Sequence, residues 1–364
     1  MTGDSIRIER PRGLHQFEEF ARLPFLVYRG RDAWWPPDIR NEIALLSEKS
    51  PLSRHLEIEP LCVRAAGRIV ARSIAVVNRR YIEHWNEPLG HLISFETLEG
   101  YDAAVAAMLD AAAGWLRERG MRAVRSGFAA FLDYPYAIDN YEALSSFLLR
   151  GNPPSYHRHL KNAGFVTEKG QVDFTIPLAR EILDRYRTIA AANPAGIEVR
   201  SWREFGFAGA IGAWTAVTNA AFDRHWGWNP VTREEVRPML APLEATPVAD
   251  LSMIAVRNGE AIGAVFSVPD LSPALVRLTP GTRLDPERGG GTRGALINIG
   301  VIERERGHGA AMAMAARSFL AMAAQGMRYA GYTLVLDDNW ASRRTAAALG
   351  ARITGNFVTY RREL

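Results

Sequence analysis

The chain repeats one order of elements, with matching segments about 190 to 200 residues apart, and this repeat constrains the fold most strongly. Residues 63–77 and 256–268 are both apolar, and each contains a short turn, at Gly67 and at Asn258–Gly259. Two apolar strands around such a turn are typical of a β-hairpin. The other matches are short strands from Ile6 and Ile197, strands from Leu92 and Leu296, helical stretches at 152–165 and 339–351, and terminal strands at 172–178 and 356–364. The sequence therefore predicts two copies of one α/β unit.

Each copy places a helical stretch directly after a central strand, and a strand–helix–strand step favours a parallel strand pair. The hairpins add antiparallel strands. We therefore expect two tandem α/β domains, each with a mixed, mostly antiparallel sheet around a central parallel strand pair flanked by helices. The expected ranges are a first domain at 1–178, a linking helix at 179–196 and a second domain at 197–364. The connection 269–294 is rich in Pro and Gly and is expected to be an exposed loop, with a flexible glycine run at 289–291.

Composition places the chain among ordinary globular proteins, with 48% hydrophobic and 23% charged residues in 364. Its first residues lack the apolar core of a signal peptide. The most apolar stretch, 310–324, contains Arg317 and is too short to span a bilayer. The single cysteine, Cys62, excludes an intramolecular disulfide and a zinc site built on cysteines. We therefore expect a cytoplasmic protein without a membrane segment and without a metal cofactor.

The charge distribution permits an anionic ligand and makes a nucleic-acid partner the minority interpretation. The formal net charge is +4, and the 44 basic residues include only three lysines. The arginines are scattered along the chain and form no basic stripe with interleaved aromatic residues. Since recognition of nucleic acid usually depends on such a stripe, no nucleic-acid partner is expected.

One turn near the C-terminus has the residue pattern of an anion site. The segment 304–309 reads R-x-x-G-x-G and lies between an apolar strand, 295–301, and a helical stretch from Ala310. A glycine-rich turn that opens a helix directs several backbone N–H groups and the positive end of the helix dipole to one place. Gly307 and Gly309 allow close approach of a phosphate, and the arginines add charge-assisted hydrogen bonds. The turn therefore predicts a pyrophosphate site.

The residues around this turn, NIGVIERERGHGAAMA, resemble the acyl-CoA loop of the GNAT acetyltransferase superfamily, in which R/Q-x-x-G-x-G/A follows the fourth strand. The later segment YTLVLDDNWASRRTAAALGA resembles the next motif of that superfamily, a strand that ends near an Asn and is followed by a helix. The resemblance covers roughly residues 197–364, and 6–178 repeat its outline. The chain is thus similar to tandem two-domain members with a degenerate N-terminal copy.

The resemblance implies an N-acetyltransferase that uses acetyl-CoA, or another acyl-CoA, as co-substrate. The fourth and fifth strands would splay apart around the pantetheine arm, and an amine would attack the thioester directly in a ternary complex. Backbone groups near Ile299 and Val301 would polarise the thioester carbonyl. The further residues that the resemblance assigns to the cofactor are Arg304, Arg306, Gly307, His308, Gly309, Ala310, Asn339, Ser342 and Arg343.

The proton donor of the superfamily is missing from its usual place. Many members have a Tyr seven residues after the motif Asn, and here that position is Ala346. Tyr360 and Tyr332 are candidate substitutes, although aromatic packing in a sheet is the favoured interpretation of each. Asp338, beside Asp337, and Glu303 are candidate bases; a helix cap and a solvated side chain are the competing interpretations.

The acceptor side is expected between the early helices of the second copy, in the segment FDRHWGWNPVT, residues 222–232. An acidic or imidazole group there could bind an amine or act as a base, and tryptophans could form the walls. The alternative is that the tryptophans fill a domain interface. The candidate substrate-binding residues are Phe222, Asp223, His225, Trp226 and Trp228.

The first copy lacks the glycine-rich turn. After residues 91–96 it has acidic residues at the corresponding place, Glu96, Glu99 and Asp102. Carboxylates at a helix N-terminus suit the helix dipole but repel a pyrophosphate. We therefore expect acyl-CoA in the second copy only.

The sequence predicts an acyl-CoA-dependent N-acyltransferase whose acceptor is a small-molecule or peptide amine. One alternative is a non-catalytic CoA-binding or sensory protein, which the position of Ala346 favours. A second alternative is an aminoacyl-tRNA-dependent transferase of the same fold, which would need a basic groove and no acyl-CoA loop.

Overall fold

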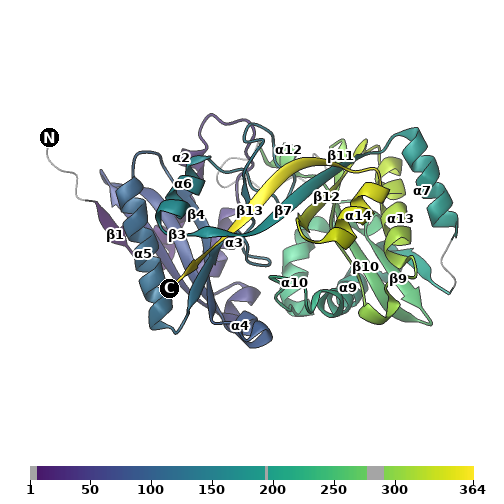
Figure 1. The fold of residues 1–364 in the computed structure, drawn as a ribbon, viewed down its shortest axis with the longest axis horizontal. Coiled ribbons are helices and arrows are strands. Elements are labelled where there is room, and N and C mark those ends of the chain that lie inside the picture. The colour runs from purple at the N-terminus through teal and green to yellow at the C-terminus, as the bar shows by residue number, and fades with distance from the viewer. Residues whose placement is uncertain (1–5, 193–195, 277–290) are drawn as a thin grey trace. The chain divides into compact units, whose positions relative to one another are not determined.

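The computed structural model describes residues 6–192, 196–276 and 291–364 (Figure 1). The chain forms two compact units. The first contains the described residues up to Gly170, residues 275–276 and Phe357–Leu364. The second contains Gln171–Ala274 and residues 291–356.

The first unit is built on a sheet in which, among the residues that the structure describes, β4 and β5 are the parallel neighbours. The strands, in sheet order, are β1 (Arg7–Glu9), β2 (Leu56–Ala65), β3 (Arg68–Asn78), β4 (Leu89–Thr97), β5 (Ala123–Ser126) and the end of β13 (Arg352–Glu363), with β6 (Tyr136–Ala137) also paired to β13. The helices are α1 (Gly13–Ala21), α2 (Leu23–Val27), α3 (Ile39–Leu46), the 3₁₀ turn η1 (Pro51–His55), α4 (Arg79–Trp85), α5 (Asp102–Glu118) and α6 (Ser155–Asn162).

Alternation along the strands gives the first unit two apolar layers. Leu61 and Val63 of β2 belong to one buried cluster with α5 and α6, whereas Cys62 between them belongs to a second cluster with α1 and α3. Helices therefore cover both faces of this sheet, which follows from its near-continuous apolar strands.

The second unit repeats this plan, again with one parallel pair, β11 and β12. Its strands, in sheet order, are β7 (Val166–Pro177), β12 (Tyr329–Leu336), β11 (Arg293–Val301), β10 (Glu260–Pro269), β9 (Met253–Arg257) and β8 (Glu198–Ser201). Its helices are α7 (Arg180–Ala192), α8 (Trp202–Phe205), α9 (Phe207–Phe222), α10 (Arg233–Leu240), the 3₁₀ turn η2 (Ala241–Leu243), α11 (Val248–Leu251), α12 (Ser272–Leu275), the 3₁₀ turn η4 (Glu303–Glu305), α13 (Ala310–Ala324) and α14 (Trp340–Ala348).

The predicted fold class is confirmed, and so are both hairpins. The turns between β2 and β3 and between β9 and β10 have two residues each, both with positive φ: 49° and 75° at Ala66 and Gly67, and 52° and 81° at Asn258 and Gly259. Two successive left-handed residues form the turn that matches the twist of paired strands.

The last strand of each copy has a different sheet partner from the one that boundaries at 178 and 197 imply. Tyr360–Glu363, at the end of the chain, pair with β5 of the first unit. Gln171–Pro177 of β7 pair with β12 of the second unit. The predicted linking helix is α7, and Tyr186 on it donates a hydrogen bond of 2.5 Å to the carbonyl of Leu349 in the second unit. Alternating apolar residues identify a strand but do not specify its partner, which is why the sequence missed this exchange.

The expected loop 269–294 contains the short helix α12, and residues 277–290, with most of the glycine run, lie outside the described residues. Among the helices that the structure describes, none combines the length and the apolar character needed to cross a membrane.

Candidate active site

The parallel strands of the second unit, β11 and β12, are paired over only part of their length. β11 and β12 pair only from Arg293–Tyr329 to Leu296–Tyr332. Beyond Leu296, β11 pairs with β10 alone, and the end of β12 pairs with β7. A gap between two strands of one sheet therefore opens at their carboxyl ends, where α/β sheets commonly bind ligands.

A bulge at Ile297 marks the point of separation. The register with β10 shifts there, because Phe266 is opposite Asn298 and Ser267 is opposite Leu296. The shift changes which face of the sheet a given position of β11 points to. A Cβ on Gly294 would lie 2.6 Å from Met322 of α13, whereas one on Gly300 would lie 2.8 Å from Ala221 of α9. Without the extra residue, positions 294 and 300 would share a face.

The bulge also sets which backbone groups face the gap. Ile302 donates its N–H to Ile262 of β10 at 2.9 Å, so alternate residues of β11 bond to β10. Ile299 and Val301 lie between these positions, so their N–H groups point away from β10, towards the gap. The carbonyl of Val301 already accepts a hydrogen bond of 3.1 Å from Arg306 on that side.

The turn after β11 has the backbone of an open anion site. Gly307 and Gly309 have φ angles of 82° and 84°, in the left-handed region that favours glycine. A Cβ on Gly307 would meet no atom within 4 Å, so this part of the turn is open. Gly309 directly precedes the 15-residue helix α13, and no side chain caps the helix N-terminus. The first N–H groups of α13 thus remain available for an anion.

The two arginines of the motif have other contacts. Arg306 donates to the carbonyl of Val301 and, at 2.8 Å, to that of Ala221, so it ties the turn to β11 and α9. Arg304 forms an exposed ion pair with Glu260. His308 is exposed and lies 3.3 Å from the carbonyl of Glu305. The backbone, more than these side chains, is therefore the part of the turn that could bind a phosphate.

The turn after β12 lies at the same edge, because the carboxyl ends of parallel strands share one edge of a sheet. Asn339 caps α14 by accepting a hydrogen bond of 3.1 Å from Ser342 N–H. Arg343 donates to the carbonyl of Asp337 at 2.8 Å. Asp338 is exposed beside this cap, and Glu303 is exposed on the opposite turn.

The parallel strands of the first unit separate in the same way, but different side chains lie between them. β4 and β5 pair only from Leu89–Ala123 to Leu92–Ser126. β4 bulges near Ser94, where φ is 54°.

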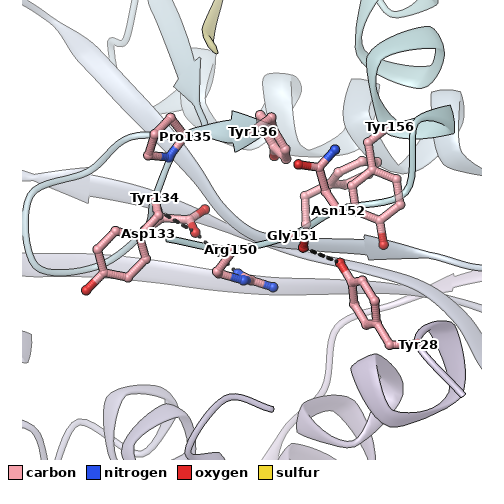
Figure 2. Close-up of a pocket in the computed structure, with 10 residues that line it drawn as sticks. Tyr28, Asp133, Tyr134, Pro135, Tyr136, Arg150, Gly151, Asn152 and Tyr156 are labelled. Atoms are coloured by element: carbon pink, nitrogen blue, oxygen red, sulfur yellow. Dashed lines mark hydrogen bonds and ion pairs between the residues drawn. The ribbon is translucent and has the colours of Figure 1, made fainter. Parts of the chain in front are cut away.

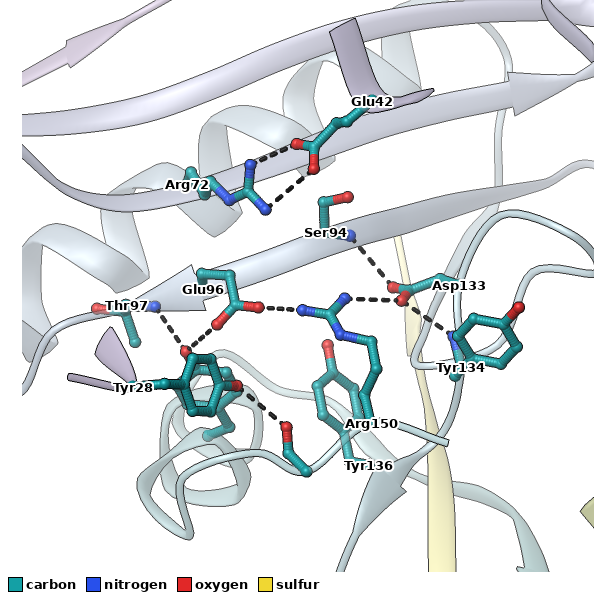
Figure 3. Close-up of polar contacts among 12 residues, drawn as sticks. Tyr28, Glu42, Arg72, Ser94, Glu96, Thr97, Asp133, Tyr134, Tyr136 and Arg150 are labelled. Carbon is teal, nitrogen blue, oxygen red and sulfur yellow. Dashed lines mark hydrogen bonds and ion pairs between the residues drawn. The ribbon is translucent and has the colours of Figure 1, made fainter. Parts of the chain in front are cut away.

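Beyond that bulge, Glu96 is fully buried and accepts hydrogen bonds from Arg150 and, at 2.7 Å, from Tyr156 OH (Figure 3). Arg150 also donates to Asp133 at 3.3 Å. These side chains, together with Tyr28, occupy the region where the strands separate, and Figure 2 shows the narrow space that they leave.

The entrance of the first unit's gap is also bridged. Asp102, at the start of α5, lies 3.2 Å from Arg158 and 3.4 Å from His159 on α6. The acidic residues were expected to repel a phosphate; in the structure, Glu96 and Asp102 form ion pairs with local side chains.

Comparisons with known proteins bear on the fold. No model of a protein family matches the sequence. Solved structures that resemble the chain include a tandem GNAT protein from the clavulanic acid biosynthesis pathway, with 13% identity and a TM-score of 0.59 over 99% of this chain and 98% of that one. Another is a GCN5-related N-acetyltransferase from Sphaerobacter thermophilus, with 17% identity and a TM-score of 0.55 over 98% and 95%. This chain has the tandem GNAT fold.

Two curated proteins are similar to it in sequence. Protein YghO of Escherichia coli is 21% identical over 276 residues, which are 72% of this chain and 68% of that protein. The bacterial ceramide synthase of Caulobacter vibrioides is 20% identical over 268 residues, 72% of this chain and 70% of that protein.

Within the GNAT fold, Tyr360 lies outside the unit that carries the glycine turn. It is buried in the first unit, and its hydroxyl lies 2.8 Å from Nδ1 of His157. Burial raises the pKa of Tyr360 to about 12. Because β13 ends in the first sheet, Tyr360 belongs to the first unit, whereas the sequence placed it in the second domain.

Tyr332, unlike Tyr360, lies in the second unit, next to the point where β11 and β12 separate. It forms the last pair of β12 with β11, opposite Leu296, directly before the gap opens. It is 5% exposed, and burial raises the pKa of its hydroxyl, an effect that a hydrogen bond with Ser342 partly offsets. Ala346 is completely buried and donates nothing. The sequence showed Tyr332 just before the predicted fifth strand but not its contact with α14.

Part of the expected acceptor segment packs against β11. The ring of Phe222 would lie 3.1 Å from a Cβ on Gly300, and its centroid is 5.3 Å from those of both His225 and Trp228. Asn219 holds the segment by two hydrogen bonds to the backbone of Val231, at 2.7 and 3.1 Å. Asp223 is exposed and Trp226 is half-buried in the same segment. An aromatic wall thus lies on the α9 side of the strand that borders the gap.

Proposed function

We propose that this protein is an acyl-CoA-dependent N-acyltransferase that binds acyl-CoA once per chain, in the second unit. The observation that carries the proposal is the pair of separated strands beside an open glycine turn. Among the described residues, the second unit has this combination, and the corresponding region of the first unit holds buried ion pairs. The pyrophosphate would accept hydrogen bonds from the turn and from the first N–H groups of α13.

The reaction that fits this site is direct transfer. The nitrogen of a neutral amine attacks the thioester carbonyl carbon, the carbon–sulfur bond breaks, and the sulfur leaves as a thiolate. The N–H groups of Ile299 and Val301 would stabilise the negative charge that develops on the carbonyl oxygen. Tyr332, which its raised pKa keeps protonated, would give a proton to the thiolate, and Asp338 or Glu303 would take the proton from the amine.

For the acceptor we propose an amine attached to an apolar group. The Phe222–Trp228 wall favours apolar substrates, since aromatic side chains bury large apolar areas. The name of the Caulobacter relative points the same way, because a ceramide is an N-acylated long-chain amino alcohol. Acetyl-CoA is the acyl donor that the GNAT resemblance suggests first, and longer acyl-CoAs are the donors to compare with it.

Calorimetry and a thiol-release assay test the proposal together. We expect one CoA per chain, and thiol release from acyl-CoA that depends on added amine and is fastest with long-chain amino alcohols. Two CoA per chain would contradict the assignment to the second unit. Tight CoA binding without turnover on amines, amino acids and peptides would favour the sensory alternative. Absence of CoA binding would remove the proposal.

The two candidate bases can be separated by single substitutions. Asp338→Asn and Glu303→Gln remove one carboxylate each and keep the shape of the side chain. Substitution of the residue that acts as base should lower kcat by about 100- to 10,000-fold. It should leave the Kd of CoA nearly unchanged, because a base acts in the transition state. The other substitution serves as its control.

A further inference from the structure

Trp340 is an exposed aromatic side chain beside the candidate active site. All nine tryptophans of the chain lie in its described part. Trp340, with 61% of its surface exposed, is the one tryptophan among the exposed large apolar residues. It is the first residue of α14, directly after the capping residue Asn339. It therefore lies at the sheet edge where β11 and β12 separate and where the glycine turn begins.

One face of this indole is already occupied by a fixed cation. The guanidinium of Arg343 lies over the ring, 4.9 Å from its centroid. Arg343 is held in turn by its hydrogen bond to the carbonyl of Asp337. A guanidinium has five N–H donors, so others remain for a phosphate. A fixed ring with a cation behind it suits a planar aromatic group that carries negative charge nearby.

We propose that Trp340 binds the adenine ring of CoA by stacking, with Arg343 close to the phosphates of the same nucleotide. The inference rests on the proposed function, because CoA brings its adenine to the site only if its pyrophosphate occupies the glycine turn. Stacking of a base on an aromatic side chain is strong enough to measure and does not require hydrogen bonds to the base. Trp340 is then a residue for binding the donor and not the acceptor.

The test compares CoA with 4′-phosphopantetheine, which lacks the adenosine, its 3′-phosphate and one phosphate of the pyrophosphate. Trp340→Ala should raise the Kd of CoA about tenfold, and Trp340→Phe should retain most of the affinity. The Kd of 4′-phosphopantetheine should stay the same in both variants. Tyr329→Ala is the matched control, because Tyr329 is a 41% exposed aromatic residue at the opposite end of β12. This control should leave both affinities unchanged.

Three results would overturn the inference: an unchanged Kd for CoA in Trp340→Ala, an equal loss for both ligands, or a change confined to the KM of the amine. Each of them leaves the proposed function standing, since CoA still binds. A wild-type protein that binds neither ligand would instead refute the proposed function itself. The side chain is exposed, so its removal leaves no internal cavity and folding is not at risk.

Discussion

The two units have the same strand order around a parallel pair, and they differ in what lies between the separated strands. In the second unit the gap is bordered by backbone groups, a glycine turn and an uncapped helix. In the first unit, Glu96, Arg150 and Asp133 fill the region with buried charges, and Asp102 bridges its entrance. One strand order can therefore surround very different side chains between the separated strands.

The difference has an electrostatic cost in the first unit. Glu96 and Asp133 are 0% and 6% exposed in their side chains, and Arg150, at 22%, pairs with both. One cation thus serves two buried carboxylates. Burial raises the pKa of Asp133, and Arg150 opposes this effect.

Removal of Arg150 should have the largest effect. Arg150→Met leaves two buried carboxylates without a cation, so we expect the first unit to lose about 3–5 kcal/mol of unfolding free energy at pH 7. Because burial raises the folded pKa of Asp133, its protonated form favours the folded state, and stability is lost as the pH rises through that pKa. The deficit should therefore shrink towards pH 4. Urea unfolding at both pH values measures it.

The matched control is Arg304→Met in the second unit. Arg304 and Glu260 are both more than half exposed, and exposed ion pairs contribute little. A loss as large as that of Arg150→Met, or a pH-independent loss in the first unit, would contradict the view that Arg150 compensates buried charge.

The second prediction concerns the turns themselves. Gly307→Val should weaken CoA binding by more than about 100-fold, since a β-branched residue resists a φ of 82° and its side chain would occupy the open part of the turn. Gly100→Val is the matched substitution in the first unit, at a φ of 88° and with equal space. It should leave CoA affinity unchanged. Calorimetry on folded variants compares them, and equal losses would show that the two turns do not differ in function.

Several features that distinguish the two units could be predicted from the sequence, because each depends on residues that are close together in the chain. The turn glycines, the hairpins and the strand before α13 each depend on neighbouring residues. The glycine turn could be predicted as an anion site for the same reason.

The rest depends on contacts between distant residues. Arg150 meets Glu96 across 54 positions, and Tyr360 reaches His157 across 203. A strand pattern does not name its partner, so the sequence placed Tyr360 in the wrong unit. The bulge at Ile297 was equally hidden, because it arises from pairing with β10.

The third prediction uses two tyrosines, one in each unit. Tyr332→Phe should lower kcat by about 100-fold with little change in the Kd of CoA, because the hydroxyl acts as a proton donor only in the reaction. The loss should be smaller with thioesters whose leaving thiol is more acidic, since such a thiolate needs a proton less. A uniform loss across thioesters, or a raised Kd, would assign Tyr332 to the shape of the gap.

The last prediction, with the smallest effect, concerns Tyr360→Phe. His157 Nε2 lies 2.8 Å from the carbonyl of Ala137 and must donate to it, so Nδ1 accepts the proton of the Tyr360 hydroxyl. The substitution removes one buried hydrogen bond and leaves the ring packing, so we expect a loss of about 1 kcal/mol in the stability of the first unit. Because Tyr360 belongs to that unit, kcat and CoA affinity should not change. Thermal unfolding and the thiol-release assay measure the two quantities. A loss of kcat comparable to that of Tyr332→Phe would return Tyr360 to the reaction and would mean that the chain's last strand carries chemistry as well as structure.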